Sequence, residues 1–224
     1  LNKVISTSNA GVNVPVTVTY NTVGNNGVAT NNTVALRLTG MKYTSGNSTV
    51  STTTLAVDTN LMTLVASKPT VVYNDVSNQN AVGGLNKIAR VTVSADAGGP
   101  VSLLDLPLSI TTSGTTAQTS GTVTVKVNGS LVATTDSLGA AGTSTTATGT
   151  ISFTNGYDIA AGGSVVFDVY DSSLTMNTSG DSVASTLGSA TLFTWNDTNG
   201  SSTQIITGSA LYNFPSETTV LVKY

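Results

Sequence analysis

Acidic and amide side chains gather at two places in the sequence where oxygen chemistry would be expected. Asp168 and Asp171 flank the end of an alternating run, and the loop Trp195–Gly200 (WNDTNG) is rich in Asn and Asp. Oxygen ligands of this kind suit Ca²⁺, so Asp197 and Asn199 are the calcium candidates. The loop lacks the alternating acidic pattern of an EF-hand, and the same residue types cap ordinary turns. The sequence therefore predicts a turn here and no firm metal site.

Two residue types that carry much enzyme chemistry are absent. The chain has no His and no Cys, which excludes thiol catalysis, disulfides and cysteine metal sites and removes the commonest general base. A glycosidase needs two carboxyl groups facing one cleft, which a sequence alone does not place. A Ser or Lys nucleophile without His needs a Ser–Lys pair, and no such motif is present. We therefore predict that the protein is not an enzyme and has no cofactor.

Two further interpretations rest on single side chains. A self-formed Lys–Asn isopeptide bond needs a buried Lys beside a carboxylic acid. Lys126 alternates onto the polar face of its strand, whereas the position of Lys87 is less clear. Trp195, the sole Trp, could form a sugar-stacking platform with tyrosines, but one Trp in a sandwich more often fills the core. A glycan-binding or adhesin module is therefore kept as an alternative function.

Asn-x-Ser/Thr sequences, which accept glycans in a host that has the pathway, occur six times. They begin at Asn31, Asn47, Asn128, Asn177, Asn196 and Asn199. Several are expected by chance in a chain this rich in Asn, Ser and Thr. We treat all six as candidate glycosylation sites.

Composition excludes several classes of function. The chain has 224 residues, of which 39% are hydrophobic and only 8% charged, with a net charge of −3. Eight scattered Lys and Arg make no basic patch for nucleic acid. No apolar run approaches the ~20 residues of a membrane helix. Abundant Val and Thr, with 22 Gly, indicate strands and turns. The composition predicts an all-β protein with no nucleic-acid partner and no membrane insertion.

Runs of alternating apolar and polar residues recur along the chain, separated by turn signals at the spacing of a β-sandwich. The clearest expected strands are Lys87–Ala95, Val101–Ile110, Thr122–Val127, Thr148–Phe153 and Ser164–Tyr170, with Thr33–Leu38 and Thr218–Val222 as further candidates. Asn128-Gly129 predicts a type I′ hairpin turn. No segment has a sustained helical period.

An additional strand is predicted at Gly11–Gly24, almost at the start of the chain. Shifting this region by 149 residues aligns it with a later segment, and after an insertion of seven residues the match extends to Thr63–Val65. The aligned pairs include Val16 with Val165, Val18 with Phe167, Tyr20 with Val169, Val34 with Val183 and Val65 with Leu221. The repeat divides the chain into a partial module, residues 1–67, and a complete module, residues 68–224, joined by a semi-rigid linker at Pro69.

The complete module carries a recognisable series of motifs. They are Lys68–Val71 (KPTV), Leu85–Ala97 (LNKIARVTVSADA), Ile159–Gly163 (IAAGG), Gly180–Val183 (GDSV) and Phe193–Asp197 (FTWND). This series resembles the repeated β-sandwich modules of large cell-surface proteins from candidate-phyla (Patescibacteria-type) bacteria. The resemblance implies a secreted, repetitive surface or fibre protein and supplies no catalytic residues.

The sequence thus predicts immunoglobulin-like antiparallel β-sandwich modules, about one and a half in the chain. Half a sandwich exposes an apolar face and an unpaired edge, so its missing half lies either upstream or in another subunit. We expect an extracellular, cell-surface structural subunit, mature after cleavage, that forms a homopolymer filament or surface layer by strand complementation. The expected inter-subunit contacts are the inward residues of the first strand: Val12, Val14, Val16, Val18 and Tyr20.

Overall fold

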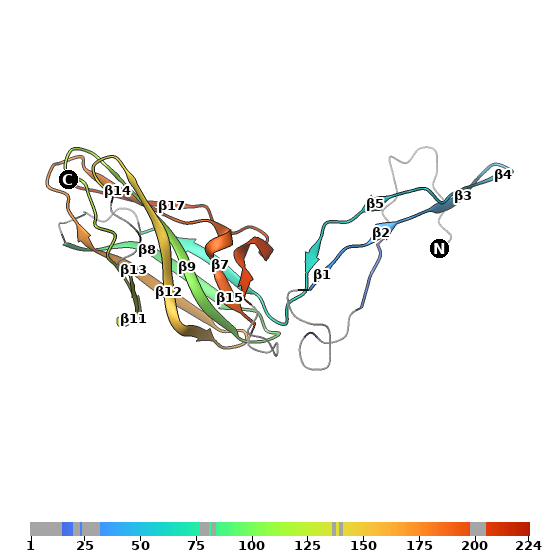
Figure 1. Cartoon of the computed structure of the whole chain (residues 1–224), viewed down its shortest axis with the longest axis horizontal. Coiled ribbons are helices and arrows are strands. Elements are labelled where there is room, and N and C mark those ends of the chain that lie inside the picture. Colours follow the sequence, from blue (N-terminus) through green and yellow to red (C-terminus); the bar gives the residue numbers. More distant parts are fainter. Residues whose placement is uncertain are drawn as a thin grey trace.

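The protein consists of a β-sandwich and a thin hairpin that projects from one end of it (Figure 1). The computed structural model describes residues 15–19, 23, 32–76, 81, 84–135, 138, 141–197 and 205–224. Strands dominate these residues, and the only helical segments among them are two 3-10 turns, η1 (Ala190–Leu192) and η2 (Gly208–Ala210). No helix in the described part of the chain is long and apolar enough to cross a bilayer. The predicted all-β, antiparallel sandwich fold is confirmed.

One layer of the sandwich, sheet I, has five antiparallel strands in the order β11–β10–β13–β8–β7. Their bounds are β7 (Pro69–Asn74), β8 (Gly84–Ala95), β10 (Val123–Val127), β11 (Ser130–Thr135) and β13 (Ser164–Leu174). Strands β7 and β11 are therefore the edges of this sheet.

The other layer, sheet II, is organised around the long strand β9 (Val101–Ser113). Strand β12 (Thr146–Ile159) pairs with one side of β9. On the other side, β15 (Thr194–Asn196) and β14 (Ser182–Leu187) pair with successive halves of β9. They are followed outward by β16 (Ile206–Thr207) and β17 (Thr218–Val222), respectively.

The strands that alternation predicts in residues 68–224 are all present. Each of the six expected runs lies within a strand or within one residue of its ends. The Asn128-Gly129 turn is confirmed as well: Val127 pairs with Ser130, and both turn residues have positive φ, 50° and 83°. Only such a turn matches the twist of the two flanking strands, and glycine adopts its second position without a Cβ clash.

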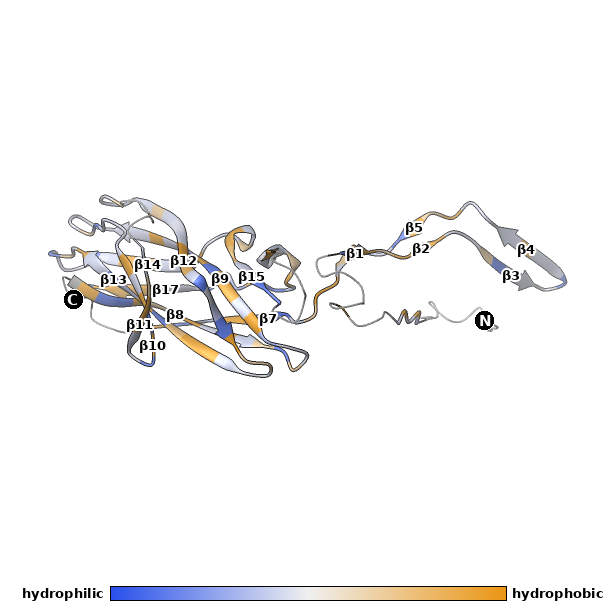
Figure 2. Ribbon diagram, turned by 60° about the horizontal axis from the view of Figure 1, so that its bottom comes forward, coloured by the Kyte–Doolittle hydropathy of each residue, from blue (hydrophilic) through white to orange (hydrophobic). Residues whose placement is uncertain are grey.

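The core lies between the two sheets. Its largest fully buried side chains include Trp195, Phe167 and Phe193. Phe193 packs against Trp195 and Phe214, with ring centroids 6.0 and 5.3 Å apart. Burial alternates along β10, where Val123, Val125 and Val127 are buried. Every second side chain of a strand points to the same face, so these three face the core. Figure 2 shows the same alternation of hydropathy along the strands of the sandwich.

The projecting hairpin, here called the arm, comprises residues 32–63 and forms three short antiparallel ladders. Their strands are β1 (Thr33–Val34) with β6 (Met62–Thr63), β2 (Arg37–Leu38) with β5 (Val57–Asp58), and β3 (Met41–Ser45) with β4 (Ser48–Thr52). The expected strand Thr33–Leu38 is thus divided into two. Gly40 lies between the outer two ladders, and only glycine fits there without a shift, because a Cβ at this position would lie 2.5 Å from the Thr52 carbonyl oxygen.

Within the predicted strand Gly11–Gly24, the described residues form no continuous strand: residues 15–19 are irregular and Val23 forms an isolated bridge. Residues 15–19 pair with no described strand. Val16 and Val18, expected to face inward, are 72% and 42% exposed. The physical reason is pairing: a strand needs a neighbour for its backbone groups, and the segment that aligns with it, β13, has β8 and β10 on its two sides.

The repeat predicts that Val34 and Val65 correspond to Val183 and Leu221, which are direct partners in the β14–β17 ladder. In the arm the corresponding segments also pair, but Val34 lies opposite Met62, so the register differs by three residues. Strand β14 is held against β9 in sheet II, whereas β1 pairs with β6 alone among the described strands. The division into partial and complete modules stays a prediction.

Candidate assembly surface

The arm exposes apolar side chains in cross-strand pairs. Val34 pairs with Met62, Leu38 with Val57 and Tyr43 with Val50, one pair in each ladder. Partners directly across an antiparallel ladder share one face of it. Most of these side chains are about half exposed: Leu38 51%, Tyr43 47%, Val50 42%, Val57 59% and Met62 47%. Among the described residues, the arm therefore has apolar surface with no second layer packed on it.

Polar pairs alternate with the apolar ones. Arg37 donates two hydrogen bonds to the Asp58 carboxylate, at 2.6 and 2.8 Å. This bidentate pair lowers the pKa of Asp58 and raises that of Arg37. Thr44 lies opposite Thr49, with their hydroxyl oxygens 3.4 Å apart. The arm is thus amphipathic, although it contains no core.

The joint between arm and sandwich, residues 64–68, is fastened by two carboxylates of the sandwich. The Ala66 N–H donates to Oδ2 of the buried Asp197 at 2.7 Å. The Lys68 N–H donates to Oδ2 of Asp96 at 3.3 Å, and the Asp96 N–H donates back to the Lys68 carbonyl at 3.2 Å. The buried Ser67 hydroxyl donates to the Gly99 carbonyl at 2.6 Å. These bonds direct the chain out of the sandwich along one path.

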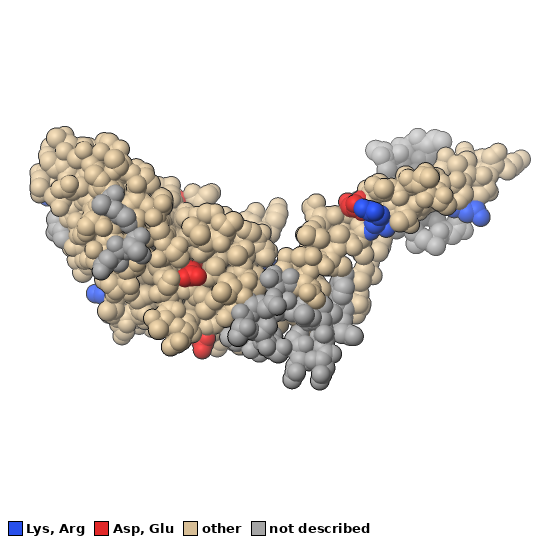
Figure 3. Space-filling view, viewed as in Figure 1, with Lys and Arg blue, Asp and Glu red and all other residues tan. Residues whose placement is uncertain are grey.

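Formal charge differs between the two parts of the chain. Residues 1–67 contain three basic residues and one acidic residue, a net charge of +2. Residues 68–224 contain five basic and ten acidic residues, a net charge of −5. Charged side chains are sparse on the face that Figure 3 shows, and most of that surface is neutral. The arm and the sandwich are therefore weakly complementary in charge.

The predicted inter-subunit residues are only partly visible. Val12, Val14 and Tyr20 lie outside the described residues, while Val16 and Val18 are exposed. The arm itself, from Leu38 to Met62, presents more apolar surface than these two residues, and sequence analysis did not select it. The alternation of Met41 and Tyr43 with polar residues is the signal that could have found it.

The candidate glycosylation sites differ in exposure. Asn47, Asn128 and Asn177 are exposed in turns or loops, and Asn196 is half-buried in β15. Asn31 and Asn199 lie outside the described residues. Asn47, at the arm tip between β3 and β4, is the one of these sites that lies on the arm's described part.

The acidic candidates do not converge on a metal. Among the described residues, no group of three or more acidic side chains could hold one. Asp168 forms ion pairs with Arg90, at 2.7 Å, and Lys87, at 3.2 Å. Asp171 accepts from the Thr119 hydroxyl at 2.6 Å. The calcium candidate Asp197 holds the joint, and its expected co-ligand Asn199 is not described.

The structure places Lys87 in an ion pair and Trp195 in the core. Lys87 lies beside Asp168, but Arg90 contacts the same carboxylate. Partial burial acts to raise the pKa of Asp168, and the hydrogen bonds from Arg90 and Lys87 together outweigh it, so the pKa is lowered. In a Lys–Asn isopeptide bond the Asn carboxamide is the electrophile, and the neighbouring carboxyl group transfers the proton. A carboxylate held ionised by two cations does not suit that role, so this geometry favours an ion pair over an isopeptide bond. Trp195 is fully buried, which confirms its interpretation as a core residue and removes it from any sugar-stacking surface.

Comparison with known proteins does not place the chain in a family. No protein-family model matches the chain, and no curated protein matches its sequence. The resemblance to repeated cell-surface modules therefore stays a prediction.

Proposed function

We propose that the protein is a structural subunit of an extracellular filament or surface layer and assembles with copies of itself by β-strand complementation. The observation that carries the proposal is the arm: a two-stranded hairpin with exposed apolar pairs such as Tyr43 and Val50. A two-stranded hairpin is at best marginally stable in water and gains stability when a third strand or a second layer covers it. A second subunit is the partner that supplies this layer.

The joint supports the same function. Because Asp96 and Asp197 hold residues 66–68, the arm leaves the sandwich in a defined direction. An arm that reaches a different surface patch on the next subunit makes a heterologous contact, and repetition of such a contact without closure produces a fibre or a sheet. Extracellular location remains part of the proposal and follows from the resemblance given above.

Negative-stain microscopy of the purified full chain tests this function. Filaments or sheets that appear as concentration rises are the expected result, since the arm is then covered by a neighbour. Hydrogen exchange in the same samples should show protection of residues 32–63 only after assembly. Discrete monomers at high concentration, with the arm already protected, would contradict the proposal. Glycan binding remains the alternative, but the burial of Trp195 gives it no support.

A further inference from the structure

Among the described strands, β7 pairs only with β8, so its other edge is open, and the direction of its backbone hydrogen bonds is defined. The Asp96 N–H donates to the Lys68 carbonyl, so these two residues form a hydrogen-bonded pair just beyond the β7–β8 register. Bonding direction alternates along an antiparallel strand. The N–H and C=O groups of Val71 and Tyr73 therefore point to the outer edge, away from β8. Pro69 also has an outward position, where its missing N–H removes no bond to β8.

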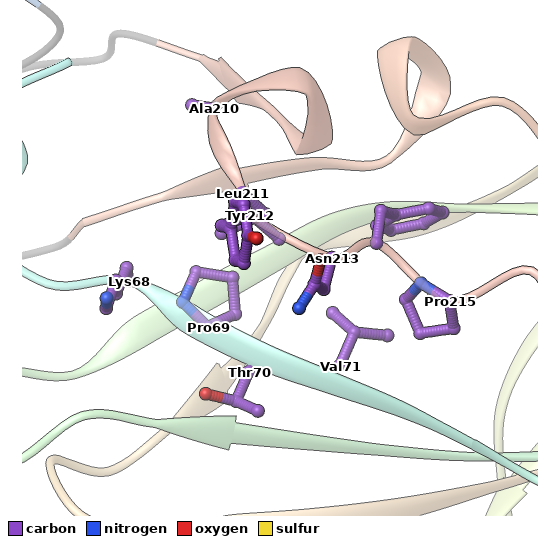
Figure 4. Close-up of a pocket in the computed structure, with 10 residues that line it drawn as sticks. Lys68, Pro69, Thr70, Val71, Ala210, Leu211, Tyr212, Asn213 and Pro215 are labelled. Carbon is purple, nitrogen blue, oxygen red and sulfur yellow. The ribbon is translucent and has the colours of Figure 1, made fainter. Parts of the chain in front are cut away.

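A pocket of about 310 Å³ lies directly against this edge. Residues 68–71 line one side of it, and residues 210–215 line the other. Figure 4 shows Pro69 and Val71 pointing toward the 211–215 segment, whereas Thr70 points to the opposite side of the strand. We call this the edge pocket. Its lining combines apolar groups such as Val71 and Leu211 with polar ones such as Asn213. A pocket for side chains beside an open strand edge is the arrangement of a β-augmentation site.

The walls of the edge pocket are preformed. Phe214 packs on the buried Phe193 with ring centroids 5.3 Å apart, and Leu211 also packs against the core. Tyr212, in contrast, is 93% exposed. Because Tyr212 lines the pocket and is almost wholly in solvent, a partner seated there would contact its ring.

The arm of the same chain is poorly placed to occupy the edge pocket. Only residues 64–68 separate β6 from β7, and residues 66–68 are held by Asp197, Gly99 and Asp96. From this clamped joint the arm extends away from the sandwich (Figure 1). Donor and acceptor are thus present in one chain but kept apart, so a second copy is needed to bring them together.

We propose that the β7 edge and the edge pocket of one subunit accept strand β3 of a second copy, with Tyr43 as the residue that enters the pocket. This inference rests on the proposed function and identifies its acceptor. Strand β3 has five residues, and the free edge from Pro69 to Tyr73 spans five. Met41 and Tyr43, 50% and 47% exposed, lie on one face of β3.

Charge favours this pairing over contact between two arms. The arm carries Arg37, Lys42 and Asp58, a net charge of +1, and approaches a sandwich of net charge −5, whereas two arms would bring like charges together. Lys42 of β3 alternates with Met41 and Tyr43, and the exposed Glu217 lies two residues beyond Pro215 of the edge pocket. Arm-to-arm packing would also give a closed pair, which ends growth.

Photo-crosslinking of the full chain tests the acceptor. p-Benzoylphenylalanine replaces Tyr43, and this chain is mixed with isotope-labelled wild-type chain so that adducts between copies are distinguished by mass. The expected adducts join position 43 to residues 69–74 or 210–217 of the labelled chain. Adducts to the labelled arm or to β11, or none although the mixture assembles, would overturn the inference and leave the proposed function standing. A wild-type chain that never associates would contradict both the inference and the proposed function.

A point variant provides an independent measurement. Tyr212→Ala should weaken self-association at least about tenfold without changing the fold, because this side chain is almost wholly in solvent and anchor residues dominate interfaces. The matched control is Tyr224→Ala, which removes another exposed tyrosine, 78% exposed and outside the edge pocket. Equal association by the two variants would contradict a role for the edge pocket.

Discussion

The buried aspartates of the sandwich accept hydrogen bonds from nearby loops, and in the described part of the chain they do not gather into a metal site. Asp171 accepts from the Ser173 N–H at 2.8 Å as well as from Thr119. Asp181 accepts from the Thr116 hydroxyl and from the N–H groups of residues 115, 116 and 178. Hydrogen bonds to an ionised acceptor are stronger than neutral ones. In a chain with so few charges, these aspartates fasten loops.

Asp181 predicts a specific acid sensitivity. The Thr116 hydroxyl, followed by the backbone N–H groups, lowers the pKa of Asp181 to about 2, below the value of about 3.9 in an unfolded chain. As pH falls, the unfolded state takes up this proton first. The stabilisation is therefore complete above about pH 5 and is lost as pH approaches 2. Urea unfolding from pH 6 to pH 2 should show a smaller acid-induced loss in Asp181→Asn than in the wild type. Equal acid-induced losses in the two chains would contradict this role of Asp181.

The buried position of Trp195 predicts that its substitution lowers the stability of the fold. A Trp that stacked on sugars at the surface would have little effect on stability. Trp195→Ala should lower the free energy of unfolding by about 3–5 kcal/mol, because it leaves a large cavity among Phe193 and its neighbours. Denaturant unfolding monitored by circular dichroism measures the change. An effect below about 1 kcal/mol, the range of surface substitutions, would contradict the buried position.

At the scale of elements, the joint determines how the arm is presented. Asp197→Ala removes the charged acceptor of the Ala66 N–H. Such bonds are worth about 1.5–3 kcal/mol, so amide exchange at Ala66 should accelerate about ten- to hundredfold. Asp105→Ala is the control, since this carboxylate accepts from Ser152 and Thr194 within the sandwich. Unchanged exchange at Ala66 would show that the joint is held by other contacts.

Alternation predicted the strands of the sandwich because it is a local property of each strand. The inward face of β10 follows from the alternation within that strand alone, at Val123, Val125 and Val127. The turn at Asn128-Gly129 likewise depends on two adjacent residues. The same rule failed for residues 15–19, because a strand also needs a partner. The joint was not predictable either: Asp197 is 131 residues from the Ala66 N–H that it accepts from.

The arm was not selected from the sequence as the candidate surface. Sequence patterns predicted that the first 67 residues lack a complete module, and this division stays a prediction. They placed the contact at Val12–Tyr20, whereas the described apolar pairs centre on Leu38, Tyr43 and Val57. Pairing across the arm joins residues up to about thirty positions apart, and no local pattern contains this information.

At the scale of the whole molecule, donor and acceptor belong to different parts of one chain. The arm projects from one end of the sandwich, and the β7 edge starts at the joint itself (Figure 1). When the arm of one copy pairs with the edge of another, the second arm remains free for a third copy. Growth of this kind does not close unless the rotation between subunits happens to form a ring.

The central claim is that the arm drives association, and sedimentation velocity of the full chain tests it most directly. The comparison is with a Tyr43→Ser/Val50→Thr variant, which keeps strand-compatible residues but removes one exposed apolar pair. We predict that the wild-type sedimentation coefficient rises with concentration and that the variant remains a monomer with the same circular dichroism spectrum. Equal association of both chains, or a wild type that stays monomeric at every concentration, would contradict the account.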